Sequence, residues 1–239
     1  MLASPAMRRS ASILALLVLA SAASASRAGA ATLALDRGCY LAKQPGLPNG
    51  QTIGVRGEGF APDTQVAFTL GDTAIGSLTS TPSGAVAGQF QAPALAGGAQ
   101  FRATPALTAS DGTSQTAVPV ELRRLAADFL PSSGNPRTLR VRFYVYGFGP
   151  LLEGRRLSTS QPVFEHVFDP RGRRRATIAA GRTTGPCGDL RTTRRRILPF
   201  RTVANGRWRF VFTTSRRYSR RAAPLASVGF VVRTVFRPL

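Results

Sequence analysis

The chain has 239 residues, 43% of them hydrophobic, and a formal net charge of +21. This apolar content is enough for packed cores and excludes general disorder, and the length allows one large domain or two of ordinary size. A charge this positive favours an anionic partner. Lys43 is the sole lysine, however, so 31 of the 32 basic residues are Arg, a bias that codon supply in a GC-rich genome would also produce. The charge is therefore either functional or compositional.

The positive charge is concentrated in one half of the chain. Residues 31–124 contain six basic and six acidic residues, whereas residues 125–239 contain 23 Arg and five acidic residues, a net charge of +18. A half-molecule this basic repels itself unless anions gather around it. We therefore expect residues 125–239 to meet an anionic partner.

Residues 1–30 have the pattern of a secretory signal peptide. Two arginines precede an apolar run at 13–20, and small-residue cleavage sites follow, with cleavage after Ala30 preferred and Ala25 as the alternative. The run is shorter than the roughly 20 residues that a membrane-spanning helix needs, and no later segment is apolar enough to cross a bilayer. We expect an exported protein, secreted or associated with the cell surface, with no transmembrane span after cleavage.

Short alternating segments bounded by Gly, Pro, Asp and Ser follow the signal. Between 64 and 70, Val66, Phe68 and Leu70 fall on one face of an extended chain, which predicts a β-strand. Helical periodicity is nearly absent. Only the segment 121–130 has a pattern compatible with a helix, and we interpret its first residues as the closing strand of the first half. Further strands of the first half are expected at 85–90, 99–108 and 116–122.

The second half alternates in the same way. A junction near Leu125 precedes a Pro-rich stretch at 131–136, and strands follow it. A β-branched run at 228–236 predicts the last strand. Two earlier strands each place apolar residues on a single face: Leu139, Val141, Phe143 and Val145 in one, and Trp208, Phe210 and Phe212 in the other.

Turn residues recur at a constant distance of 88 positions. Gly59-Phe60-Ala61-Pro62 is echoed by Gly147-Phe148-Gly149-Pro150, and Pro82-Ser83-Gly84 by Pro170-Arg171-Gly172, with no gap between the two signals. A shared spacing indicates that the halves have the same framework. Each half is near the 100 residues of an immunoglobulin-like sandwich. The sequence predicts an all-β protein of two tandem immunoglobulin-like antiparallel β-sandwiches, 31–124 and 125–239, after the signal peptide.

A family resemblance lies in the first half. The segment 55–62, the strand 66–68, Pro82-Ser83-Gly84 with Phe90 and Pro93, and the turn 109–113 before Val118-Pro119-Val120 resemble bacterial extracellular immunoglobulin-like modules of the IPT/TIG type. The resemblance covers residues 50–122, and extends to the second half only through the repeated turns. It implies a fold and an extracellular location, and no catalytic residues, because such modules share architecture rather than activity.

Cys39 and Cys187 are the only cysteines. In an exported protein an even cysteine count predicts a disulfide, here one that would join the start of the first half to a turn in the second. Two cysteines and one histidine cannot complete a four-ligand zinc site, so no metal is expected.

No catalytic motif is present, and neither an enzyme nor a cofactor is expected. His166, the one histidine, shares a strand face with aromatic residues and is expected in or beside a core. A carboxylate-dependent hydrolase stays open as the least favoured alternative. It would need Glu165 to meet Asp169 or Asp189 in the folded chain.

Clustered arginines are the functional signal that the sequence offers, because guanidinium groups pair with carboxylates and phosphates and stack on aromatic rings. The candidate polyanion-binding residues are Arg171, Arg173, Arg174, Arg175, Arg194, Arg195, Arg196, Arg216 and Arg217. They predict docking on an anionic wall polymer, an acidic polysaccharide or extracellular DNA. The alternative is a purely structural extracellular scaffold with no ligand.

Overall fold

The computed structural model describes residues 30–97, 100–149, 160–221 and 224–233, so the expected signal peptide lies outside the described residues. Within those ranges the protein is all-β, with no helix. The sheets are antiparallel apart from one short parallel pair, β2 (Tyr40–Leu41) with β10 (Leu122–Arg123). No helix in this part of the chain is long and apolar enough to cross a membrane.

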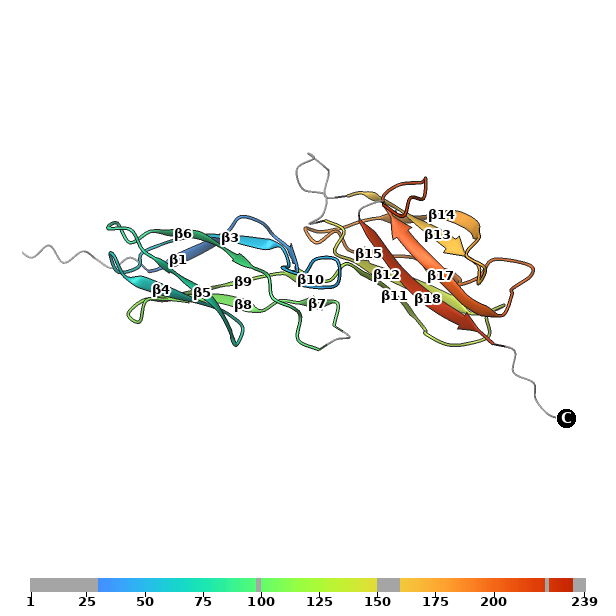
Figure 1. Ribbon diagram of the computed structural model, residues 1–239, viewed down its shortest axis with the longest axis horizontal. Coiled ribbons are helices and arrows are strands. Elements are labelled where there is room, and N and C mark those ends of the chain that lie inside the picture. Colours follow the sequence, from blue (N-terminus) through green and yellow to red (C-terminus); the bar gives the residue numbers. More distant parts are fainter. Residues whose placement is uncertain (1–29, 98–99, 150–159, 222–223, 234–239) are drawn as a thin grey trace, which may run out of the picture.

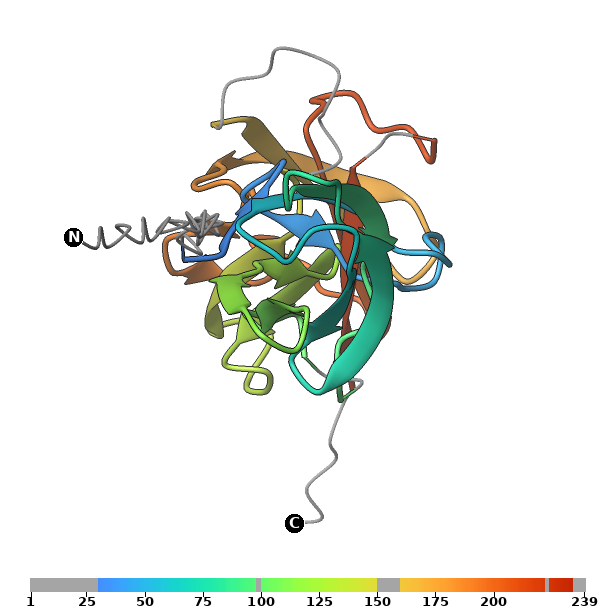
Figure 2. The ribbon, with the colours of Figure 1, turned by 90° about the vertical axis from the view of Figure 1, so that its left-hand side faces the viewer.

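The first set of strands surrounds one hydrophobic core. One sheet has the order β1-β3-β6 and a second the order β5-β4-β8-β9, while β7 pairs with β10. Alternate side chains along the strands point inward and are buried. Phe68 of one sheet packs against Phe90 of the other, with ring centroids 4.8 Å apart. Figure 2 looks onto this set from its end. Its strands are β1 (Thr32–Leu35), β3 (Thr52–Glu58), β4 (Gln65–Leu70), β5 (Thr73–Thr79), β6 (Val86–Gln91), β7 (Arg102–Ala103), β8 (Ala106–Ser110) and β9 (Gln115–Pro119).

The second set of strands surrounds a separate core. One sheet has the order β11-β12-β15, with β16 also paired to β12, and the other the order β14-β13-β17-β18. Trp208, Phe210 and Phe212 are fully buried, as the alternation predicts. The strands are β11 (Ala126–Leu130), β12 (Arg140–Tyr146), β13 (Pro162–Phe168), β14 (Arg174–Arg182), β15 (Leu190–Arg191), β16 (Arg195–Arg196), β17 (Gly206–Thr213) and β18 (Leu225–Val232).

The two sets have the same strand order. The sheet β1-β3-β6 corresponds to β11-β12-β15, and β5-β4-β8-β9 corresponds to β14-β13-β17-β18. Strands β3 and β12 lie 88 residues apart, and each ends at a glycine in the left-handed region, with φ 85° at Gly59 and 77° at Gly147. The phenylalanine after each glycine is buried. This part of the repeat is a feature of the folded chain, and the architecture is that expected of β-sandwiches.

The second pair of repeated turns, Pro82–Gly84 and Pro170–Gly172, does not mark equivalent positions in the two sets, so this part of the predicted repeat is wrong. The turn at Pro82–Gly84 carries the chain from β5 to β6, and so from one sheet to the other, whereas the turn at Pro170–Gly172 joins β13 to β14 within one sheet. The connection after β12 explains the mismatch, because residues 147–161 are 15 where the first set has six, 59–64. The nine extra residues of this connection equal the length of β5 and the turn before it. The spacing of 88 therefore recurs between two turns that stand at different places in the strand order.

A disulfide joins the two sets of strands, which lie end to end in Figure 1. Cys39 and Cys187 are bonded, as the cysteine count predicts, with their Cα atoms 5.2 Å apart and both side chains buried. The bond closes a sequence separation of 148 residues. It therefore restricts how far the two cores can move apart.

Polar and aromatic contacts reinforce this junction. The Arg123 guanidinium donates to Asp189 at 3.0 Å and lies 2.8 Å from Glu121, so it bridges carboxylates of both sets. Phe101 of the first set stacks on Tyr146 of the second, with ring centroids 5.6 Å apart. The junction is thus held by charge and ring packing as well as by a covalent bond.

Candidate functional site

Three of the four described carboxylates of the second set pair with arginines. Glu165 pairs with Arg195, Asp169 with Arg173 and Arg175, and Asp189 with Arg123. Glu165, Asp169 and Asp189 thus have different arginine partners, and the described contacts bring Glu165 together with neither Asp169 nor Asp189. The described contacts therefore do not assemble the Glu165 pair that the hydrolase alternative needs. The same pairings decide which arginines remain available to a partner.

The hairpin between β13 and β14 carries four of the candidate arginines. The Asp169 carboxylate accepts the backbone N–H of Arg171 and of Arg173, and it pairs with the Arg173 side chain at 3.2 Å and with Arg175 at 3.6 Å. Burial alone would raise the pKa of Asp169, but the hydrogen bonds and charge of Arg173 bring it below its ordinary value. Arg173 and Arg175 therefore stabilise the hairpin through their contacts with Asp169. The exposed side chains of Arg171 and Arg174 have no described carboxylate partner.

Arg195 is partly buried against the second set. Its guanidinium pairs with the buried Glu165, is only 23% exposed, and lies 5.5 Å from the ring of Phe143. Burial lowers the pKa of Arg195. Arg195 is therefore engaged by Glu165, from a strand earlier in the chain, and its guanidinium is less open to a partner than a fully exposed one. Its neighbours Arg194 and Arg196 are exposed.

Arg216 and Arg217 lie at the other end of β17 from the hairpin. Strand β17 runs antiparallel to β13, so Arg209 pairs with Phe168 beside the hairpin, and Thr213, just before Arg216, pairs with Phe164. The nine candidate arginines are therefore divided between the β13–β14 hairpin, the segment 194–196 and the loop after β17, which folds back over β13 so that Tyr218 packs on Phe168. They do not form a single cluster.

His166 lies on the outer face of β13 and is fully buried by the loop after β17. Its Nδ1 bonds to the Thr177 hydroxyl at 3.0 Å, while Nε2 lies 3.1 Å from the Thr213 hydroxyl and 3.2 Å from the Ser215 carbonyl. Because a carbonyl only accepts, Nε2 donates its N–H to Ser215, and Nδ1 can accept from the Thr177 hydroxyl. Burial lowers the pKa of His166, and the charge of Arg174 adds to the effect. The histidine is a packed structural group, as expected.

A groove on the outer face of this sheet was missed by the sequence analysis. It has a volume of about 520 Å³. Arg207 and Arg209 both enter it from β17, and both are exposed. Strict alternation with the buried Trp208 places these two arginines on the outer face, and that period was the signal that could have found them. The lining residues are Phe168, Asp169, Pro170, Gly172, Arg207, Arg209, Ser227, Val228 and Gly229.

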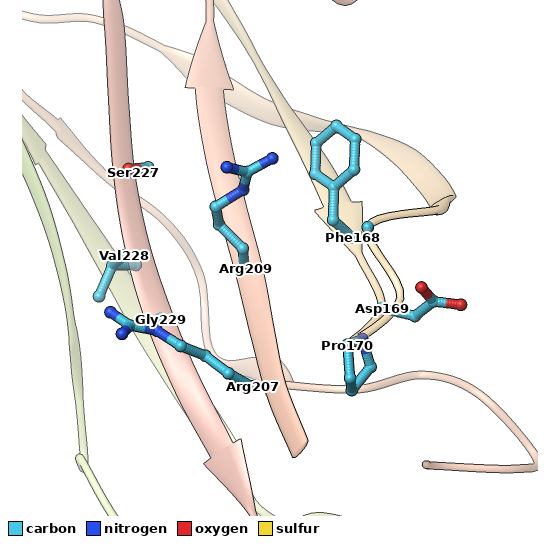
Figure 3. A pocket seen from close by; sticks show the side chains of 9 residues that line it. Phe168, Asp169, Pro170, Arg207, Arg209, Ser227, Val228 and Gly229 are labelled. Carbon is cyan, nitrogen blue, oxygen red and sulfur yellow. The ribbon is translucent and has the colours of Figure 1, made fainter. Parts of the chain in front are cut away.

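The two guanidinium groups rest on opposite walls of the groove. Arg209 lies over the Phe168 ring, 5.0 Å from its centroid. Arg207 crosses Gly229, where a Cβ would come within 2.8 Å of its Nε atom. In Figure 3 the carboxylate of Asp169 points away from both arginines. The groove therefore presents two positive charges and no inward-facing negative one among the residues that line it.

A second arginine surface covers the outer face of the other sheet. Arg142 and Tyr144 lie along β12 on that face, and the Arg191 guanidinium lies 5.9 Å from the Tyr144 ring. This surface continues to Tyr146, whose ring is already stacked on Phe101. Both outer faces of the second set are thus basic. Among the described residues, no group of three or more His, Cys, Asp or Glu side chains could hold a metal ion.

Comparison with known proteins assigns no family. No family model matches the chain, and no curated protein matches it. One similar solved structure is described as "Crystal structure of tetra-tandem repeat in extending region of large adhesion protein"; it is 16% identical with a TM-score of 0.25. The match covers 84% of this chain and 48% of that one, so the chain spans about half its length. A likeness this weak carries no conclusion about function.

Proposed function

We propose that the protein is a secreted, non-enzymatic module of two tandem immunoglobulin-like β-sandwiches, 31–124 and 125–239, whose second sandwich docks on an anionic cell-surface polymer. The shared strand order of the two sets supports the tandem arrangement. The pattern of residues 1–30 supports export.

One observation carries the docking role. Glu165, Asp169 and Asp189 each form an ion pair with an arginine of the protein. Other arginines remain exposed on both outer faces of the second set. The first half has a balanced charge, so this surplus gives the molecule one cationic end. A surface of this kind concentrates anions around it and steers charged polymers toward it.

Retention on immobilised polymers tests the proposal. The mature protein, residues 31–239, is applied at low salt to resins carrying an acidic polysaccharide, duplex DNA or an anionic wall polymer, with a neutral polysaccharide resin as the control. We expect retention on at least one anionic resin and release as salt rises, because displaced counterions supply the driving force. Passage through all three anionic resins would contradict the docking role.

A purely structural scaffold is the second candidate, and the junction favours it. The Cys39–Cys187 bond and the Arg123–Asp189 pair hold the two sets together without any ligand. In that case R171S/R174S, which removes two hairpin arginines that have no described carboxylate partner, would leave retention at the cell surface unchanged. The docking role predicts weaker retention of the same variant.

A further inference from the structure

The groove over β13, β17 and β18 concentrates positive charge in a concave site. Arg207 and Arg209 line it, neither guanidinium makes a hydrogen bond or ion pair with another described residue, and Asp169 is turned outward in Figure 3. Guanidinium groups in such a position are open to a planar oxyanion, which they hold through two parallel N–H donors. The site therefore suits an acidic group rather than a neutral one.

The groove also fixes how these guanidinium groups are presented. The Phe168 ring supports one face of Arg209, and the missing side chain at Gly229 lets Arg207 lie flat across β18. A planar guanidinium that is already held in place loses less conformational entropy on binding than a freely rotating one. This arrangement differs from a solvated charge run, whose arginines have no fixed resting place.

The aromatic ring beside the groove is not available for stacking. Phe168 is only 6% exposed, because Arg209 covers one side and Tyr218 packs against it with ring centroids 4.8 Å apart. Single-stranded nucleic acid is bound through bases stacked on open aromatic faces, and this groove offers none. Arg207 and Arg209 supply the charged lining, which favours a ligand recognised by its acidic groups.

We propose that this groove is the primary contact for an acidic polysaccharide, with sugar carboxylates held by Arg207 and Arg209. This inference rests on the proposed docking function and names the site and the ligand class for it. It also assigns the specific contact to residues outside the arginine runs, so those runs supply long-range attraction rather than recognition.

Charge-conserving variants of the mature protein test the groove apart from net charge. R207K/R209K keeps both charges but loses the planar fork and the support of Phe168. G229V keeps every charge, and its new side chain occupies the place of Arg207. The matched control is R220S/R221S, which removes two exposed arginines from the loop after β17. Fluorescence of Trp208, which is buried beneath the same sheet, reports whether each variant folds.

The probe is a soluble polygalacturonate oligomer, with an oligothymidine of similar charge as the second arm. We expect R207K/R209K and G229V each to bind polygalacturonate about tenfold more weakly than the wild type, as loss of a charge-assisted contact implies. R220S/R221S should bind nearly as well as the wild type, and oligothymidine binding should be insensitive to G229V.

Three results would overturn the inference in different ways. If R207K/R209K binds like the wild type while R220S/R221S is weakened, net charge alone acts; the groove is wrong and the docking function stands. If oligothymidine binding falls with G229V as much as polygalacturonate binding does, the polysaccharide assignment is wrong. If the wild type binds neither probe nor any anionic resin at low salt, the docking function falls together with the groove.

Discussion

Replacing Glu165 with leucine should destabilise the second core strongly. The substitution leaves the Arg195 guanidinium against the Phe143 ring with no described counter-charge. Breaking a buried ion pair by removing one partner costs about 3–5 kcal/mol. Because the Arg195 side chain keeps 23% of its exposure, water screens part of the loss and we expect the lower end, about 3 kcal/mol. The double variant E165L/R195M, which removes both charges, should recover to within about 1 kcal/mol of the wild type.

Urea unfolding followed by tryptophan fluorescence measures this effect. Trp208 is the only tryptophan and is fully buried in the same core as the ion pair, so its emission reports this core alone. For a domain of this size, 3 kcal/mol corresponds to a fall of about 1.5–2 M in the urea midpoint. If E165L cost less than about 1 kcal/mol, or if the double variant were as unstable as the sum of the two single variants, the reasoning would be refuted.

Three further changes have expected outcomes. Lowering the pH from 7 toward 5 should destabilise the second core, because the folded-state pKa of His166 is below its ordinary value of 6.5 and the unfolded chain takes up the proton first; urea midpoints of H166Q should vary less over this range. C39S/C187S should keep both cores folded but unfold at lower urea, with about 5 kcal/mol as the ceiling that chain entropy sets for a separation of 148 residues; an unchanged midpoint would mean that the disulfide adds nothing. Backbone N–H groups of Ala61 and Ser114 lower the pKa of Asp111 in the folded chain, so its carboxylate stabilises the fold above the unfolded-state pKa and loses that effect as it is protonated. D111N should therefore lose less thermal stability below pH 4 than the wild type, as measured by circular dichroism.

Local pattern predicted much of the fold. Period-two alternation identified the inward residues of β4, β12 and β17, because a strand with one buried face must alternate. The expected run at 99–108 is instead two short strands, β7 and β8, and the last strand begins at Leu225, three residues before the expected start. Strand ends depend on partner strands, which local pattern does not contain.

The candidate site was harder to predict because its determinants are long-range. Arg195 stands between two exposed arginines and has the same local pattern, yet its partner Glu165 lies 30 residues earlier on a strand of the other sheet. Arg207 and Arg209 share one face of β17 by local alternation, but the groove that they line exists only because the β13–β14 hairpin and β18 lie beside them. Charge density along the chain therefore pointed to the runs rather than to the groove.

The salt dependence of polymer binding decides whether arginine charge drives docking. The affinity of the mature protein for a labelled acidic polysaccharide is measured by fluorescence anisotropy between 50 and 200 mM salt. We expect the affinity to fall steeply, by about tenfold or more over this range, because several arginines release counterions together. An affinity that is undetectable at 50 mM salt, or that does not change with salt, would contradict it.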